Sequence, residues 1–321
     1  MSGHGLESSR NLQQTAASVL MIRPASFGWN PETVSSNRFQ AAARGDGGDA
    51  RTLATAEFDA LVSALTDAGV MVHALADRPE PPCPDAVFPN NWVSLHADGT
   101  VVLYPMLAAN RRRERRLDLL LELERLGACR VERMLDLTHH ELHGRFLEGT
   151  GSVVFDHVSR TAYACRSPRT DAAVLDELCG ELGYEPVMFD ATDAGGAPIY
   201  HTNVMLSIGR RYALVCAEAV AAEQRDALRE RLAAGARRVL EIDRNAMASF
   251  AGNVLELRGA GGLGVLAASR RAVHSLPPAV GAALASCVDR IVAVPAPTIE
   301  NLGGGSVRCM LAEVFLPGTS A

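Results

Sequence analysis

Cys309 is the residue of this sequence best placed to act as a nucleophile. It directly follows Arg308 and comes shortly after three consecutive glycines, Gly303 to Gly305. Glycines let the backbone approach a neighbour closely or adopt positive φ, and a nearby cation favours a thiolate. The segment therefore predicts a nucleophilic cysteine. The alternative is that Cys309 is a small buried apolar residue ahead of a core strand.

Two further segments supply an acid–base pair for such a thiol. His201 opens an apolar run, and Glu148 stands between a hydrophobic residue and glycines, a poor position for a solvated carboxylate. A thiolate can attack a planar sp² carbon, while a histidine protonates the leaving nitrogen and then activates water. Cys309, His201 and Glu148 together predict hydrolysis of an acyl- or amidine-type group through a covalent adduct. Each of the three, taken alone, could also be structural.

A third segment groups one carboxylate and two amides around an aromatic ring: Asp85, Phe88, Asn90 and Asn91. Such a set can hold a planar group that is rich in N–H bonds. The alternative is a turn that uses Asp, Pro and Asn for their backbone preferences.

A repeated unit explains how these distant residues could meet. Hairpins are predicted to start near residues 92, 152, 204 and 254, and each is followed by an amphipathic helix and another strand. Strands at 19–23 and 310–316 would pair and complete a fifth unit. The fold predicted is therefore an α/β class, a closed ring of five units, with an ordinary α+β sandwich as the alternative. In a ring, equivalent positions converge at one end of the axis, and the polar residues at hairpin openings are Asp85, Asn90, Asn91, Glu148, His201, Asn203, Asn253 and Cys309.

Composition sets the remaining bounds. The 321 residues are 48% hydrophobic and 21% charged, with a formal net charge of -6, which disfavours a nucleic-acid partner. Seven cysteines without a CxxC pair suggest free thiols in a cytoplasmic protein. No apolar run is long enough for a membrane span. We expect a flexible leader at residues 1–17 and a single catalytic domain at 18–321. Within that domain we expect a loop at 44–50, strands at 129–133 and 161–165, and helices at 111–126 and 171–182.

A histidine-rich stretch at residues 135–145 could be a lid over the site. It holds His139, His140 and His143, which also invite a metal hypothesis. No clear strand or helix fixes the three side chains, so no metal is expected.

The motifs taken together resemble the guanidino-group-modifying (arginine deiminase/amidinotransferase) superfamily. They are Phe88-Pro89-Asn90-Asn91, Glu148-Gly149-Thr150-Gly151, Arg166-Ser167-Pro168-Arg169-Thr170, His201-Thr202-Asn203 and Gly304-Gly305-Ser306-Val307-Arg308-Cys309. The resemblance implies a five-bladed α/β-propeller, the pentein fold, with pseudo-fivefold repeats. It also implies that Cys309 is the nucleophile, His201 the general acid/base and Glu148 the orienting carboxylate. By the same resemblance Arg169 grips the α-carboxylate of an amino-acid substrate, assisted by Arg111 or Arg112.

Departures from the superfamily pattern bear on the substrate. Members that act on arginine usually carry carboxylates where this chain has Asn91, Gly151 and often Asn203. Burying a cationic guanidinium without such partners is costly, whereas an asparagine amide can donate to the C=O of a neutral ureido group. The chain most resembles the citrulline-utilisation hydrolase branch. This predicts hydrolysis of citrulline to ornithine, ammonia and carbon dioxide, with Asp85 accepting a ureido N–H.

Three alternatives remain at this point. The first is an arginine deiminase or dimethylarginine hydrolase, the second an amidinotransferase, and the third a catalytically silent propeller that acts as a binding module. We expect a small-molecule amino-acid substrate, no cofactor and no nucleic-acid or membrane partner. The oligomeric state stays open, with a homodimer as the candidate.

Overall fold

The strands are grouped in threes, and every group has the same pairing pattern. In the computed structural model, which describes residues 13–40 and 47–317, the middle strand of each group pairs antiparallel on one side and parallel on the other. From the antiparallel to the parallel partner, the groups are β15 (Ala312–Val314), β1 (Ser18–Arg23) and β2 (Met71–Ala76); β3 (Val93–Leu95), β4 (Thr100–Leu103) and β5 (Arg133–Asp136); β6 (Val154–Asp156), β7 (Thr161–Cys165) and β8 (Glu185–Phe189); β9 (Leu206–Ile208), β10 (Tyr212–Val215) and β11 (Arg238–Glu241); and β12 (Leu255–Arg258), β13 (Gly264–Ser269) and β14 (Arg290–Val294).

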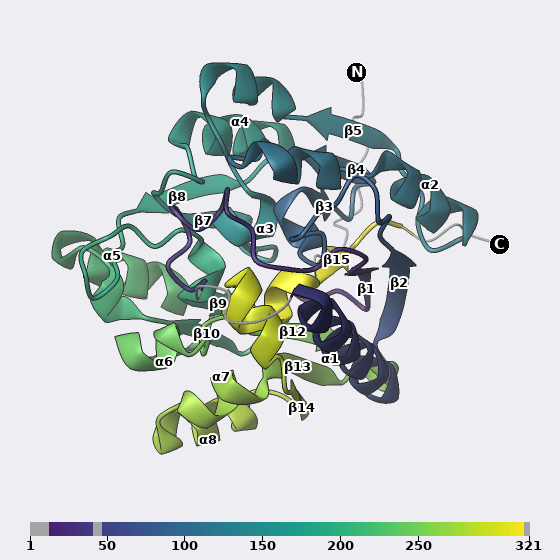
Figure 1. Cartoon of the computed structure of the whole chain (residues 1–321). Coiled ribbons are helices and arrows are strands. Elements are labelled where there is room, and N and C mark those ends of the chain that lie inside the picture. Colours follow the sequence, from purple (N-terminus) through teal and green to yellow (C-terminus); the bar gives the residue numbers. More distant parts are fainter. Residues whose placement is uncertain (1–12, 41–46, 318–321) are drawn as a thin grey trace, which may run out of the picture.

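Helices make the parallel connection in each group. A parallel pair needs a crossover, and a helix usually provides it. These helices are α1 (Gly47–Asp67), α2 (Leu117–Arg125), α4 (Ala172–Leu182), α5 (Ala222–Ala233) and, in the last group, α7 (Arg270–Ser275) with α8 (Pro278–Ser286). Figure 1 shows α2, α4, α5 and α8 near the rim of the molecule, with β3, β9, β12 and β15 closer to its centre.

The two ends of the described chain meet in one sheet. β15 pairs antiparallel with β1, with Ser18 opposite Val314, and parallel with β3 through Val314 and Leu95. Two groups thereby join in a six-stranded sheet of order β2-β1-β15-β3-β4-β5. The predicted pairing of the last strand with the first is confirmed.

The helices bury their apolar faces on these sheets, and α4 illustrates the local reasons. Asp171 caps its start, because the side chain accepts hydrogen bonds from the backbone N–H groups of Ala173 and Val174. Gly183 ends it in the left-handed region with φ of 69°. Between them, Val174, Leu175, Leu178, Cys179 and Leu182 are buried.

Some predicted boundaries are wrong. The helix expected at 111–126 is divided into a 3₁₀ helix, Ala109–Glu114, and α2, because Arg111 and Glu114 turn inward to bond each other. The strand expected at 129–133 is β5, which begins only at Arg133. The loop expected at 44–50 lies partly outside the described residues, and α1 already begins at Gly47.

The predicted leader is too long at its C-terminal end. Residues 1–12 lie outside the described residues, but Gln14, Thr15 and Ala16 are buried. Gln14 Nε2 donates to the backbone oxygens of Phe155 at 3.0 Å and Ile208 at 3.3 Å. These residues thus belong to the packed domain. None of the helices in the described part of the chain has the length and hydropathy needed to cross a bilayer.

Candidate active site

Glu148 is the hub of the buried polar cluster. It precedes the one-turn helix α3 (Gly149–Ser152), and its side chain is fully buried. Its Oε2 atom lies 2.9 Å from His201 Nε2 and 3.2 Å from Arg169 Nη1, and Oε1 accepts the backbone N–H of Leu107 at 3.1 Å. Burial opposes the charge of Glu148, yet Arg169, His201 and Arg111 together hold the pKa of its carboxyl well below its usual range. Glu148 is therefore an ionised carboxylate that bonds Arg169 and lies 3.9 Å from Arg111 Nη1.

His201 is positioned by Glu148 on one side and by Gly151 on the other. A Cβ atom at Gly151 would lie 2.7 Å from His201 Nδ1 and 2.6 Å from Asn91 Nδ2, so the ring packs directly over this glycine. Burial lowers the pKa of His201 to about 4, and the hydrogen bond with Glu148 only partly offsets that effect. The imidazole is therefore neutral near neutral pH and can accept a proton. A carboxylate side chain at position 151 would have no room beside the imidazole in this arrangement.

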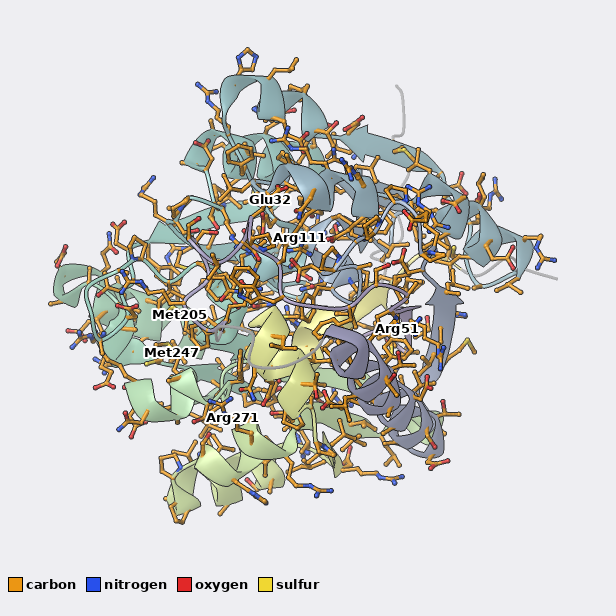
Figure 2. All side chains as sticks on the ribbon, viewed as in Figure 1. Glu32, Arg51, Arg111, Met205, Met247 and Arg271 are labelled. Atoms are coloured by element: carbon orange, nitrogen blue, oxygen red, sulfur yellow. The ribbon has the colours of Figure 1, made fainter. Side chains whose placement is uncertain are left out.

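Arg111 neutralises the acidic side of the pocket. Its Nη1 donates to Asn91 Oδ1 at 2.9 Å, its Nη2 bonds Glu114 at 2.8 Å, and its Nε lies 3.6 Å from Asp85 Oδ2. Burial raises the pKa of Glu114 to about 7 and also raises that of Asp85, in both cases against the attraction of Arg111. Figure 2 labels Arg111 beside Glu32, which accepts the backbone N–H of Asn110 at 2.9 Å. Of the arginine pair left open by the sequence, Arg111 lines the pocket, whereas Arg112 bonds Met106 O and Glu141.

Amide groups surround the thiol of Cys309. Asn253 Nδ2 lies 3.3 Å and Asn203 Nδ2 3.7 Å from Cys309 Sγ, and Asn253 Nδ2 also donates to Asn203 Oδ1 at 3.2 Å. Cys309 lies in the 3₁₀ helix Val307–Met310, ahead of the shorter-than-expected strand β15. Amide N–H groups aimed at sulfur stabilise negative charge on it without adding a charge of their own.

The glycine loop fits closely between neighbouring side chains. Added Cβ atoms would lie 2.8 Å from the Phe88 ring at Gly303 and 3.0 Å from it at Gly305. Gly304 has φ of 64°, and a Cβ there would lie 2.5 Å from Asn37 Nδ2. A π-helical turn, Ile299–Gly303, leads into this loop, as is frequent near functional sites. The glycines therefore serve close approach as well as backbone freedom.

The segment between β1 and α1 was missed as part of the site. Ser36 Oγ accepts hydrogen bonds from Arg169 Nε at 3.1 Å and Nη2 at 2.7 Å, and Thr33 O accepts from the same Nη2 at 3.2 Å. Asn30 Nδ2 donates to Asp85 Oδ2 at 2.7 Å. No periodicity marks this stretch in the sequence. Its only signal is a run of polar residues, Asn30, Thr33, Ser36 and Asn37, which is too weak to assign burial.

The pocket brings together most of the residues expected from the sequence. It is lined by Thr33, Asn37, Asp85, Phe88, Asn91, Arg111, Arg169, Tyr200, His201, Gly303, Gly304, Gly305 and Cys309. Asn203 is not part of this lining, but its Nδ2 atom contacts Cys309 Sγ. Among the described residues, Asn90 does not line the pocket: it lies behind Asn91 and accepts a hydrogen bond from the Asn91 amide at 3.1 Å. The expectation that Asn90 contacts substrate is therefore not supported by its position.

Comparison with known proteins shows the family to which the chain belongs. A family model described as N,N dimethylarginine dimethylhydrolase, eukaryotic, matches residues 23–316. The chain belongs to this family. The dimethylarginine dimethylhydrolase family lies within the guanidino-group-modifying pentein superfamily, so the superfamily resemblance seen in the motifs is confirmed. A search of curated protein sequences gives no match.

Solved structures agree on the fold of this member of the dimethylarginine dimethylhydrolase family. The N-terminal domain of ArgZ, a cyanobacterial arginine dihydrolase, in a mutant form bound to substrate, has 17% identity and a TM-score of 0.71, and the match covers 94% of this chain and 98% of that one. Unliganded AgrE has 18% identity and a TM-score of 0.72, with 94% and 40% covered. A dimethylarginine dimethylaminohydrolase mutant, as an adduct with S-methyl-L-thiocitrulline, has 15% identity and a TM-score of 0.62, with 94% and 98% covered.

Proposed function

We propose that this protein is a cysteine hydrolase that cleaves the ureido C–N bond of free citrulline. The observation that carries the substrate choice is the charge of the pocket. Asp85, Glu114 and Glu148 already face Arg111 and Arg169, while the thiol is surrounded by the amides of Asn203 and Asn253. At the thiol, a substrate therefore meets amides, and the carboxylate nearest at hand, Asp85, is already attracted by Arg111, so a neutral ureido group fits the pocket better than a guanidinium cation.

The polar groups of the pocket match the parts of citrulline. Arg169 is proposed to bind the α-carboxylate, as the superfamily resemblance implies, and Ser36 and Thr33 hold its guanidinium in place. Asp85 Oδ1 is buried and has no hydrogen-bond partner among the described residues, so it can accept an N–H of the ureido group. Asn91 lines the pocket, and the N–H of its amide that does not bond Asn90 can donate to the ureido oxygen.

The chemistry follows from the neutral state of His201. The imidazole takes the proton of the Cys309 thiol as sulfur attacks the ureido carbon, and Glu148 stabilises the imidazolium that forms. His201 then protonates the departing nitrogen, which leaves as ammonia, and a carbamoyl group remains on sulfur. Neutral His201 next activates a water that cleaves the C–S bond. The resulting N-carboxyornithine releases carbon dioxide and gives ornithine.

Residues from different groups of strands meet in one pocket. We propose that the five groups of strands form a closed propeller of the pentein type, because the proposed catalytic residues come from three different groups yet share one pocket. The first strands of neighbouring groups also contact one another at β15 and β3, β6 and β9, and β9 and β12.

The deciding experiment is a substrate panel. Purified protein is incubated separately with citrulline, arginine and dimethylarginine, and ornithine, citrulline and ammonia are measured over time. We expect ornithine and ammonia from citrulline, and loss of turnover in Cys309→Ala with an unchanged circular dichroism spectrum. Citrulline released from arginine or dimethylarginine, without ornithine formation from citrulline, would overturn the substrate proposal.

A guanidinium substrate is the second candidate. The family match favours it, since the matching model is described by dimethylarginine hydrolysis. The same panel distinguishes the two, and an acceptor amine added to the reaction would expose an amidinotransferase through its amidinated product.

A further inference from the structure

A cluster of two histidines and a glutamate lies outside the active site. His139 and His140 come from the 3₁₀ helix Thr138–His143, and Glu177 comes from α4 (Figure 1). One ligand atom from each of the three side chains lies within 4.8 Å of the others. The two oxygens of the Glu177 carboxylate each face one imidazole ring. Oε2 lies 2.8 Å from His140 Nε2, and Oε1 lies 3.8 Å from His139 Nε2.

We propose that His139, His140 and Glu177 form a divalent metal site of the zinc type. Two imidazole nitrogens and one carboxylate are a ligand set that zinc takes, with a fourth position for water. Zinc–nitrogen and zinc–oxygen bonds of about 2.0–2.1 Å place tetrahedral ligands roughly 3.3 Å apart. The 2.8 Å spacing joins His140 Nε2 to Oε2 and the 3.8 Å spacing joins His139 Nε2 to Oε1, so a metal on one carboxylate oxygen requires side-chain rotations that bring both imidazoles to that oxygen.

One histidine ring is oriented by a second partner, as is usual for a metal ligand. His139 Nδ1 lies 3.2 Å from the backbone oxygen of Asp136, and donation to that carbonyl places the ring proton on Nδ1 and leaves Nε2 free. The other histidine must give up its Nε2 hydrogen bond to Glu177 and carry its proton on Nδ1, which is buried without a hydrogen-bond partner among the described residues. The metal bond has to offset this loss, so the affinity expected is moderate.

A metal at this cluster would link two segments of the chain that lead to residues of the candidate active site. The 3₁₀ helix Thr138–His143 leads into Glu148, and α4 begins shortly after Arg169. Leu147 and Thr170 already form a β-bridge between these two segments. A metal that links the helix to α4 would therefore brace, from the outside, the pair of segments that carries Glu148 and Arg169.

The test uses zinc alone on the full chain. Protein without an affinity tag, in a Cys309→Ala background to remove the reactive thiol, is stripped of metal and titrated with zinc chloride in a calorimeter. The side chains of His139 and Glu177 are substantially exposed, so we expect both His139→Asn and Glu177→Gln to fold. His143→Asn is the matched control, because that histidine belongs to the same helix but not to the cluster.

The expected result is one zinc per chain at this site and a zinc-induced rise in the unfolding temperature. His139→Asn and Glu177→Gln should each weaken binding by more than about 10-fold, the loss that even outer-shell partners can cause. Both should also abolish the thermal shift, while His143→Asn should bind like the parent. Equal affinity in all variants, or no binding by the parent, would overturn the proposal.

Discussion

At the scale of single residues, the site depends on neighbours that hold the proposed catalytic side chains in position. Cys309, His201 and Glu148 each pack against a neighbour that takes no part in the proposed proton transfers and bond changes: Asn253, Gly151 and the backbone of Leu107. Two of these neighbours can be tested by small substitutions, because each makes a specific contact with a reactive atom.

Asn253→Ala should slow both turnover and thiol alkylation. The substitution removes the amide that lies 3.3 Å from Cys309 Sγ. A hydrogen bond to a charged group contributes about 1.5–3 kcal/mol, so a loss of roughly 10- to 100-fold in kcat is expected. The alkylation rate of Cys309 by iodoacetamide at pH 7 should fall in parallel. An unchanged alkylation rate would show that the amide does not stabilise the thiolate.

Gly151→Ala should remove activity without unfolding the protein. Its new methyl group would overlap the His201 ring, because the Cβ position lies only 2.7 Å from Nδ1. We expect a fall in kcat of more than about 100-fold, the size of effect that a displaced acid–base group produces. Gly180→Ala is the matched control: that glycine lies in α4 with no heavy atom within 4 Å of an added Cβ, and its activity should be unchanged. Full activity in Gly151→Ala would contradict the assigned position of His201.

At the scale of elements, the polar segment between β1 and α1 positions Arg169, the arginine that is proposed to bind substrate. Arg169 comes from a loop that precedes α4, and its guanidinium is held by Ser36 and by the carbonyl of Thr33. Gln40 and Asn37 bond the backbone of the glycine loop, Leu302 to Gly304, so the same segment also restrains the loop before Cys309.

Ser36→Ala should raise KM more than it lowers kcat. The hydroxyl accepts two hydrogen bonds from Arg169, and their loss frees the guanidinium that is proposed to grip the α-carboxylate. The expected rise in KM is roughly 10-fold, from a hydrogen bond to a charged group of about 1.5 kcal/mol. Ser35→Ala, at the exposed neighbouring position, is the control and should leave KM unchanged. A loss confined to kcat would place Ser36 in the chemistry instead of in binding.

Elements with a local signal were predictable from the sequence. β7 was predicted at its observed bounds, and α4 within one residue, because a capping aspartate and a glycine in the left-handed region mark its ends. The helix boundary near Arg111 was not, since the side chain turns inward to pair with buried acids that come from distant segments. The two short helices α6 (Arg244–Ala248) and α7 contain too few residues for a periodic pattern.

The same division holds for the candidate site. Residues with reactive side chains beside glycines, such as Cys309 and Glu148, stand out in the sequence. Tyr200, Asn37 and Ser36 do not, because their importance comes only from partners more than a hundred residues away: Tyr200 donates to Gly304 O, Asn37 donates to Gly303 O, and Ser36 accepts from Arg169. The predicted lid at residues 135–145 contains a 3₁₀ helix, and this helix brings two of its three histidines to Glu177.

At the scale of the whole molecule, buried ionisable groups make stability depend on pH in two opposing ways. Burial lowers the pKa of His96 to about 4 and that of His157 to about 3. These histidines stabilise the fold fully above pH ~6.5, the unfolded value, and lose that contribution as pH falls toward the folded values. Burial raises the pKa of Glu313 to about 7, as it does for Glu114, so their contributions are complete at acidic pH and are lost as pH rises through 7.

A histidine substitution separates the two effects. In His157→Gln, the loss of stability on going from pH 7 to pH 4.5 should be smaller than in the wild type by about 2 to 3 kcal/mol. The reason is that His157 is buried and bonded to Tyr184 through Nδ1 at 2.8 Å, so protonation is far less favourable in the fold than in the unfolded chain. Urea denaturation at both pH values measures the difference. The exposed His274→Gln control should follow the wild type, and identical pH dependence in His157→Gln would contradict the prediction.

The pairing of β1 with β15 also sets when the protein becomes chemically competent. Ser18 and Val314 meet across almost the entire described chain, and such distant contacts form late in folding because closing a long loop costs entropy. Cys309 lies three residues before β15, so we expect its thiol to reach Asn203 and Asn253 at about the stage when this closure occurs. We therefore expect the proposed nucleophile to be among the last groups assembled, and its thiol to be less reactive in a partly folded chain. The rate at which thiol reactivity appears during refolding would therefore report the rate at which β1 and β15 pair.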